Sequence, residues 1–238
     1  MTEIRNYESA EEVAQAAAEN AIEILQLAIE SKGAASWVLA GGSSPMLAYK
    51  KLVKDYSDAI DWSKVLLFIG DERMVSLDSK DSNWGAIGKI FDKSPELMKA
   101  KRIIPDTSVD ALVTANLYEQ QIKSEGIAEF DLVWLGVGED GHTLSFFPGN
   151  IAFTEPTEKW VISVRDSPKP PAERISLSLK ALEYVDELVI FAVGASKQDA
   201  LKLARLKRAL PIAVAADVVE SNGGEVRWLY DEAAWNDD

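Results

Sequence analysis

Cysteine is absent from this sequence, and histidine occurs only once, as His142. The lack of cysteine excludes disulfides and thiolate metal ligands, and one imidazole cannot build a multi-histidine zinc site. We therefore predict no bound metal, although a cation held by carboxylates alone stays open. Any reaction that needs an imidazole must use His142.

Long hydrophobic runs are also missing. No stretch approaches the roughly eighteen apolar residues of a membrane span. Residues 1–5 (MTEIR) have neither the basic region nor the apolar region of a signal peptide. These absences predict a cytoplasmic protein.

Basic residues are scarce relative to acidic ones. The chain has 25 Lys and Arg against 39 Asp and Glu, which gives a formal net charge of -14. This charge repels phosphodiester backbones and anionic headgroups, so neither nucleic acid nor a membrane is an expected partner. An anionic metabolite would also be repelled, and it would need a few well-placed cations and backbone amides to hold it.

The length of 238 residues, with 47% apolar and 27% charged residues, fits one globular domain over residues 1–238. Residues 9–31 carry apolar side chains at helical spacing. Ser9 and Glu12 have the spacing of a capping box, and Gly33 ends the pattern. A first helix is predicted there.

Four short apolar runs are each followed by a turn of glycine and polar residues. Such runs fit strands buried on both sides, which predicts an α/β fold with a largely parallel sheet and helices on both faces. Ligands of such sheets bind beyond the carboxyl ends of the strands, so the turns are expected to converge on one crevice. The runs and turns are residues 37–40 with 41–45, 65–69 with 70–73, 130–135 with 136–142, and 188–193 with 194–197.

The first turn consists of Gly41, Gly42, Ser43, Ser44 and Pro45. Small residues let the main chain turn closely, and we predict Ser44 as the N-cap and Pro45 as the first residue of a helix. Free amides at such a helix start favour an anion such as phosphate. A tight strand-to-helix turn without a ligand is the alternative, and this motif alone does not decide between them.

The third turn, residues 136–141, matches the G-x-G-x-x-G fingerprint of dinucleotide-binding folds and has Asp166 downstream. In a true fingerprint the glycines open a helix that takes the pyrophosphate. Here Pro148 and Gly149 come too soon for that helix. We therefore reject a dinucleotide site.

The same turn ends at His142, two residues after Asp140. A neutral imidazole can take a proton from water near pH 7 and return it to a leaving oxygen. A lone histidine in a loop is more often a surface residue than a catalytic one. A catalytic role for His142 therefore depends on which residues lie near it.

Charged residues follow the other strands as well. Asp71 or Glu72 could bind hydroxyls, and Arg73 could neutralise a phosphate or a developing oxyanion. Each could equally be ordinary surface charge. Further cations in two other loops are Lys169, Arg174 and Lys197.

Five motifs span most of the chain: LAGGSSP at 39–45, GDERMV at 70–75 with Ser82 and Asn83, LGVGEDGHTLSFFPG at 135–149, PKPPAERISL at 168–177, and Gly194 with Lys197. Each is weak alone, but all five in this order are highly specific. Together they resemble the 6-phosphogluconolactonase family, within the larger group that includes glucosamine-6-phosphate deaminases. The resemblance extends from about residue 38 to residue 228.

The resemblance implies a modified Rossmann-like α/β fold and hydrolysis of 6-phospho-D-glucono-1,5-lactone in the oxidative pentose phosphate pathway, without an organic cofactor. The expected partner is this phosphorylated sugar lactone, and the protein is expected to be a monomer or a small homo-oligomer. His142 would be general base and then acid, Asp140 would support the imidazole, and Arg73 would stabilise the tetrahedral intermediate. The residues expected to hold the substrate are Gly41, Gly42, Ser43, Ser44, Asp71, Asn83, Lys169, Arg174 and Lys197.

Two alternatives stay open. The deaminase branch uses an additional acidic residue shortly after the histidine motif, whereas the next carboxylate after His142 here is Glu155. A catalytically silent sugar-phosphate sensor would keep the crevice without turnover, but the presence of His142, Asp140 and Arg73 together speaks against it. Mild departures from the family pattern, such as Ser44 in place of a threonine, concern the shape of the pocket rather than the chemistry.

Overall fold

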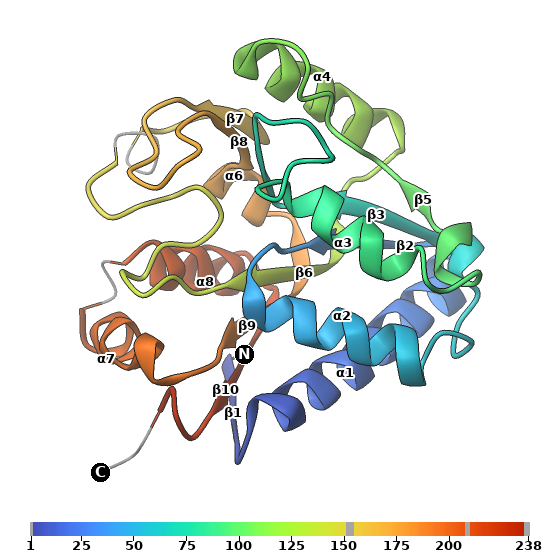
Figure 1. Cartoon of the computed structure of the whole chain (residues 1–238), viewed down its shortest axis with the longest axis horizontal. Helices are drawn as coiled ribbons and strands as arrows, with labels where there is room; N and C mark the ends of the chain where they lie inside the picture. Colours follow the sequence, from blue (N-terminus) through green and yellow to red (C-terminus); the bar gives the residue numbers. More distant parts are fainter. Residues whose placement is uncertain (1, 151–154, 208–209, 236–238) are drawn as a thin grey trace.

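A seven-stranded parallel sheet runs through the molecule (Figure 1). The computed structural model describes residues 2–150, 155–207 and 210–235. Each pair of neighbouring strands in this sheet is parallel, as predicted. In spatial order the strands are β1 (Thr2–Tyr7), β10 (Glu225–Asp231), β9 (Val185–Ala192), β6 (Phe130–Gly136), β2 (Ala35–Leu39), β3 (Val65–Ile69) and β5 (Lys101–Arg102).

Two groups of helices cover the sheet. The chain proceeds from β2 through β3 to β5 in one direction and from β6 through β9 to β10 in the other, so right-handed crossovers place the two groups on opposite faces. The first group, packed side by side, is α1 (Ala10–Lys32), α2 (Ser43–Asp55) and α3 (Asn83–Phe91) (Figure 1). The second is α6 (Leu179–Leu182), α7 (Gln198–Lys207) and α8 (Pro211–Ser221). The predicted α/β class is confirmed.

The local signals in the sequence locate most of these elements. Ser9 caps α1 by accepting a hydrogen bond from the Glu12 amide at 3.3 Å, and Gly33 ends the helix with φ 87. The capping box is only half formed, because the Glu12 carboxylate accepts from the Glu8 amide instead of that of Ser9. Strand β3 has the predicted bounds. Strand β9 begins before the predicted run, because Asp186 and Glu187 hide its start in the sequence.

A second, three-stranded antiparallel sheet was not predicted. It consists of β4 (Asp71–Arg73), β8 (Arg174–Leu177) and β7 (Val161–Val164), and α4 (Ala111–Ser124) packs against β7 and β8. The Leu177 amide donates to the Gly70 carbonyl at 2.7 Å, which ties this small sheet to the end of β3. Because Arg73 pairs with Arg174 in the register, segments a hundred residues apart along the chain meet beside the main sheet.

The direction of the crossovers changes between β2 and β6, which are neighbours in the sheet. A crevice opens beyond the carboxyl ends of the strands at such a switch point. The turns after β2 and β6 therefore face one another, as the sequence predicted. Short 3-10 helices complete the fold at η1 (Trp62–Lys64), η2 (Leu97–Lys99) and η3 (Ala195–Lys197). Within the described ranges, no helix combines the length and apolar character that crossing a membrane requires.

Candidate active site

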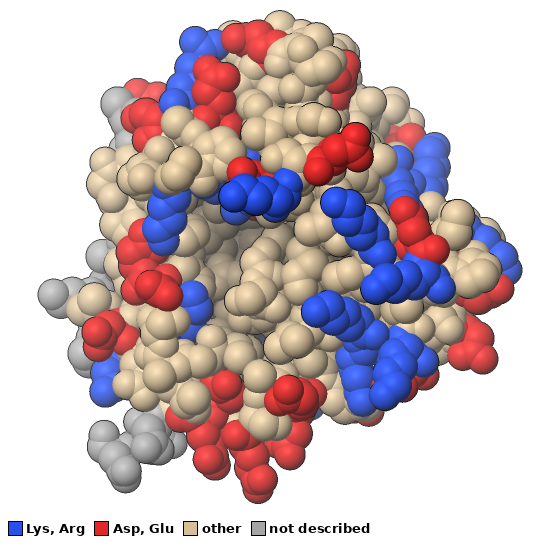
Figure 2. Space-filling model, in the orientation of Figure 1, with Lys and Arg blue, Asp and Glu red and all other residues tan. Residues whose placement is uncertain are grey.

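A cleft of about 190 Å³ lies at this switch point. Figure 2 shows it as a hollow near the centre of one face, with Lys and Arg side chains on its rim although the chain as a whole is acidic. All the predicted site residues except Asp140 and Lys169 line it. Those that do are Gly41, Gly42, Ser43, Ser44, Asp71, Arg73, Asn83, His142, Arg174 and Lys197.

The glycine turn after β2 forms one wall of the cleft. The prediction for its helix start was wrong: α2 begins at Ser43, and its N-cap is Gly42 with φ 98, so Ser44 and Pro45 already lie inside the first turn. The left-handed φ at Gly42 favours glycine there and lets the helix start earlier. No side chain caps α2, and its first turn contains no acidic residue. The amides of Ser43 and Ser44 are therefore available to an anion.

Glycine at position 41 is required by a close approach. A Cβ built on Gly41 would lie 2.1 Å from Oδ1 of Asn83. The glycine turn and the Asn83 side chain are therefore closely packed where both line the cleft.

Two buried tyrosines support the strand ends that lead to the cleft. The Tyr49 hydroxyl accepts from the Ala40 amide at 2.9 Å and donates to the Ala40 carbonyl at 3.1 Å. The Tyr118 hydroxyl does the same at Ile69, at 2.7 and 3.2 Å. Ala40 lies beyond the last residue that pairs β2 with β6, and Ile69 lies beyond the last residue that pairs β3 with β5. The hydroxyls therefore satisfy main-chain groups that these neighbouring strands do not reach. Neither tyrosine was predicted, because nothing in the local sequence pattern separates them from other buried aromatic residues.

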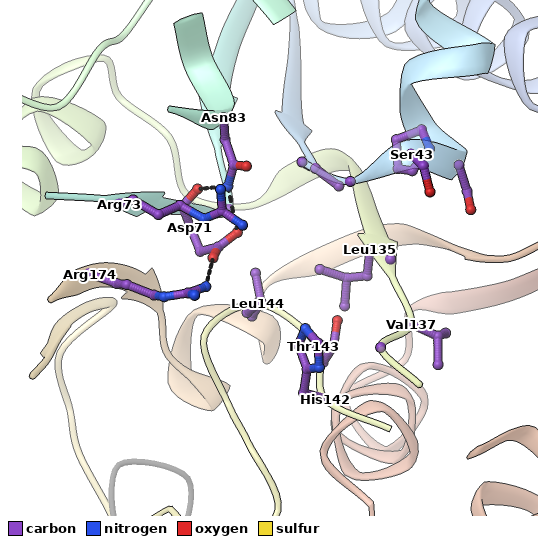
Figure 3. A pocket seen from close by; sticks show the side chains of 18 of the residues that line it. Ser43, Asp71, Arg73, Asn83, Leu135, Val137, His142, Thr143, Leu144 and Arg174 are labelled. Atoms are coloured by element: carbon purple, nitrogen blue, oxygen red, sulfur yellow. Dashed lines mark hydrogen bonds and ion pairs between the residues drawn. The ribbon is translucent and has the colours of Figure 1, made fainter. Parts of the chain in front are cut away.

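The opposite wall comes from the antiparallel sheet. Asp71 accepts from the Ser145 hydroxyl at 2.8 Å and from the Asn83 amide group at 3.2 Å, and its carboxylate lies 3.8 Å from Nη1 of Arg174 (Figure 3). Asn83 also donates to the Asp71 carbonyl at 2.9 Å. These contacts fix the orientation of Asp71 and leave Arg174 as its charged partner.

Glu72 points away from the cleft. It is fully buried and accepts from the amides of Arg73, Asn83 and Trp84 at 2.7–2.8 Å and from the Ser82 hydroxyl at 3.1 Å. Burial raises the pKa of Glu72, against the effect of these donors. Because its oxygens already accept from groups inside the protein, Glu72 shapes the loop that carries Arg73 and Asn83 and is not available to hydroxyls of a ligand.

Arg73 is oriented by that loop. Its Nη1 donates to the Asp81 carbonyl at 2.7 Å, and the side chain lines the cleft. One side of the guanidinium is therefore held by the protein while the residue faces the cavity (Figure 3).

His142 lies at the end of the turn after β6. Its Nδ1 is hydrogen bonded to Oδ1 of Asp140, and its ring is stacked on Phe147 with centroids 4.4 Å apart. A carboxylate only accepts, so Nδ1 carries the proton and the lone pair is on Nε2. Within the described part of the chain, no hydrogen bond uses Nε2.

The surroundings keep this imidazole neutral. Burial lowers the pKa of His142, and Lys169 lowers it further, against the opposing effects of Asp140 and Asp71. Burial alone would raise the pKa of Asp140. The hydrogen bond to His142, the charge that the imidazole carries at acid pH, and Lys169 lower it to about 2. Near neutral pH the pair is therefore a carboxylate beside a neutral imidazole, which is the form a general base needs.

The glycines of this turn are required for the position of the imidazole. A Cβ on Gly138 would lie 1.9 Å from Nδ1 of His142, and Gly141 has φ 79. The Gly138 amide donates to the His142 carbonyl at 2.8 Å, which closes the turn. No helix begins between residues 137 and 150, so the glycines do not open the helix that a dinucleotide fingerprint requires.

Lys197 reaches the cleft from η3, after β9. Burial lowers the pKa of Lys197, with Glu139 and Asp140 acting in the opposite direction and Lys169 in the same direction. Its ammonium forms no ion pair with any described residue. A cation without a protein partner in an otherwise acidic chain is suited to an anionic ligand.

Several lining residues were not predicted. Thr143, next to His142, is buried, and its hydroxyl has no hydrogen-bond partner among the described residues. Leu144 has φ 52, an uncommon value for a residue other than glycine. Both belong to the motif after β6, but their residue types alone do not mark them as part of a site. The other unpredicted residues are Ala40, Pro45, Gly70, Leu135, Gly136, Val137 and Gly138.

Comparisons with known proteins identify the family of this chain. Residues 8–228 match the family model described as glucosamine-6-phosphate isomerases/6-phosphogluconolactonase. The chain is 34% identical over 248 residues to probable 6-phosphogluconolactonase 1 of Arabidopsis thaliana, covering 98% of this chain and 92% of that protein. It is 32% identical over 231 residues to a probable 6-phosphogluconolactonase of Schizosaccharomyces pombe, covering 88% and 85% of the two chains.

Solved structures show the same fold. A 6-phosphogluconolactonase from Shewanella baltica superposes with a TM-score of 0.85 at 26% identity, covering 97% of this chain and 98% of that one. The 6-phosphogluconolactonase from Trypanosoma brucei gives a TM-score of 0.82 at 27% identity, covering 98% and 97%.

Proposed function

Because the chain belongs to the glucosamine-6-phosphate isomerase/6-phosphogluconolactonase family, we propose that it is a 6-phosphogluconolactonase, a carboxylic ester hydrolase. Its substrate would be 6-phospho-D-glucono-1,5-lactone and its product 6-phospho-D-gluconate, as a step of the oxidative pentose phosphate pathway. The observation that carries this proposal is the His142–Asp140 pair at the cleft, with a neutral imidazole whose Nε2 forms no hydrogen bond to any described residue.

In the proposed reaction, Nε2 of His142 takes a proton from a water molecule whose oxygen bonds to the lactone carbonyl carbon. The carbonyl electrons move to its oxygen, and Arg73 stabilises that negative charge. When the carbonyl re-forms, the bond between this carbon and the ring oxygen breaks, and His142 returns the proton to the departing oxygen. Asp140 holds the tautomer and the imidazolium that forms between the two steps.

The substrate phosphate is assigned to the wall that the glycine turn after β2 forms. The uncapped amides of Ser43 and Ser44 and the ammonium of Lys197 provide donors and positive charge there. Asp71 and Asn83 are assigned to sugar hydroxyls or to the shape of the wall, and Arg174 to holding Asp71.

The composition of the cleft favours the lactonase over the deaminase branch. Asp71 is the only acidic residue among the described residues that line it, and Ser145 and Asn83 already donate to its carboxylate. Residues 143–149, directly after His142, contain no carboxylate. An additional acid for ring opening and proton transfer is therefore absent from this segment.

The test is release of 6-phospho-D-gluconate from freshly prepared lactone, compared with a blank without enzyme because the lactone also opens spontaneously. We expect a rate well above the blank, and a much lower catalysed rate with unphosphorylated gluconolactone. Glucosamine 6-phosphate should release no ammonia. Binding of 6-phospho-D-gluconate without turnover of the lactone would overturn the proposal in favour of a sensor.

A further inference from the structure

Lys169 stands apart from the other residues that were expected to hold the substrate. It does not line the cleft; its Nζ lies 3.3 Å from Nδ1 of His142 and 3.4 Å from Oδ1 of Asp140. Its side chain is 46% exposed, so burial alone does not hold the ammonium there. The position has to be fixed by the main chain that carries it.

The main chain of Lys169 is tied down on both sides. Its carbonyl accepts from Nη2 of Arg174 at 2.8 Å and from the Ser167 hydroxyl at 2.9 Å. Its amide donates to the Ser167 hydroxyl at 3.4 Å, and Nε of Arg174 donates to the Pro171 carbonyl at 3.0 Å. Arg174 is only 3% exposed, so the anchor of this loop is itself buried.

The Phe147 ring joins this loop to the imidazole. One contact of the ring is the stacked His142, and the Arg174 guanidinium carbon lies 5.4 Å from the ring centroid. The Lys169 ammonium lies 5.8 Å from the same centroid. The ring, the base and both cations therefore form one packed group.

We propose that Lys169 is a positioning residue for the base: Arg174 and Ser167 hold its main chain so that its ammonium stays on the His142–Asp140 pair, and it does not bind the substrate phosphate. This role rests on the proposed function, in which His142 must be neutral to accept a proton. The ammonium offsets part of the attraction that Asp140 exerts on an imidazolium, and it helps to keep the Asp140 carboxylate ionised.

Charges from three segments face the imidazole. Asp140, in its own turn, and Asp71, on β4, favour the protonated form, whereas Lys169, in the loop before β8, opposes it together with burial. Removing Lys169 leaves the two carboxylates without this opposition, and the pKa of His142 should rise. The base would then be protonated, and inactive, over a wider range of pH.

The single histidine makes the test direct, because the imidazole signal in an NMR titration of the full chain needs no assignment. Lys169→Met should raise the pKa of His142 by roughly half a unit to one unit, since one nearby charge is lost. Lys169→Arg should keep the wild-type value. Lys159→Met is the matched control: it removes one cation from an exposed lysine that bonds Asn116 on α4, and it should leave the titration unchanged.

The acid limb of kcat/KM should move to higher pH in Lys169→Met by the same amount, while KM at pH 8 stays near the wild-type value. An unchanged imidazole titration in Lys169→Met, or an equal shift in Lys159→Met, would overturn the proposal. A marked rise of KM at pH 8 would also overturn it and return Lys169 to the phosphate site. A shifted titration in a protein without lactonase activity would support the positioning of Lys169 and refute the proposed function instead.

A double-mutant cycle tests whether Arg174 contributes to holding Lys169 in place. In an Arg174→Met background the Lys169 carbonyl loses its buried donor, so adding Lys169→Met should shift the pKa of His142 less than it does in the wild type. A shift of full size in that background would show that Lys169 is held without Arg174.

Discussion

The two walls of the cleft are built in different ways. The glycine wall, which consists of Gly41, Gly42, Ser43 and Ser44, presents main-chain groups at an uncapped helix start. The charged wall consists of Asp71, Arg73, Asn83 and Arg174, and each of these side chains already contacts another part of the protein. His142 lies between the two walls (Figure 3).

This difference separates two tasks. Groups that bind an anion have to be unsatisfied before the ligand arrives. The amides of the glycine wall meet that need, as does Lys197, which forms no ion pair within the described part of the chain. Groups that support a reaction have to keep one orientation, which the charged wall achieves with its internal hydrogen bonds. Substitutions on the glycine wall should therefore change KM, and substitutions around His142 should change kcat.

The largest effect is expected for His142→Ala. Without the base, the catalysed rate should fall by at least about 100-fold, because general acid-base catalysis typically contributes that much. KM should change little, since the walls remain. The measurement is initial rate above the spontaneous blank, with circular dichroism as the check on folding; near-normal turnover would remove His142 from the mechanism.

Gly138→Ala should lower kcat by roughly 10- to 100-fold, because its Cβ would overlap Nδ1 of His142 and displacement of a reacting group by about 1 Å has costs of this size. The matched control is Gly88→Ala in α3, where the nearest atom to an added Cβ is 3.9 Å away. That variant should keep full activity. If both variants behaved alike, the close approach at Gly138 would not matter.

Lys197→Ala should raise KM for the phosphorylated lactone by roughly tenfold and leave kcat almost unchanged, as loss of uniform binding does. The unphosphorylated lactone should show no difference, because it lacks the group that Lys197 is proposed to bind. Lys202→Ala, which removes an exposed cation from α7, serves as control. An unchanged KM in Lys197→Ala would assign the phosphate to other residues.

The smallest effect is expected for the two tyrosines whose hydroxyls support the strand ends, and it concerns stability. Tyr49→Phe leaves the amide and carbonyl of Ala40 without their buried partner and should lower the free energy of unfolding by about 1–3 kcal/mol. Tyr118→Phe should cost a similar amount at Ile69. Denaturant unfolding measures both; a change below the precision of that method in both variants would mean that the hydroxyls do not stabilise these ends.

The sequence predicted much of the main sheet and its turns, since buried parallel strands leave continuous apolar runs and their turns contain glycine. It did not predict the antiparallel sheet, because β4 has only three residues and its sequence, Asp-Glu-Arg, is polar. The start of α2 was misplaced by the serine and proline signals, which the left-handed φ of Gly42 overrides. Glu72 could not be separated from Asp71 by pattern, because their opposite orientations follow from strand pairing.

What the sequence by itself determined is local: the strand-turn units, the single imidazole, and an acidic chain that must concentrate its cations to hold an anion. The tertiary structure decided which of these cations face the cleft and which serve the base. Lys169, Arg174 and Lys197 are alike in sequence as loop cations. In the structure Lys169 lies beside His142 and Asp140, Arg174 is buried as an anchor, and Lys197 lines the cleft without an ion pair to any described residue. Charge is a property of the residue, whereas its partner is set by the pairing of strands far apart along the chain.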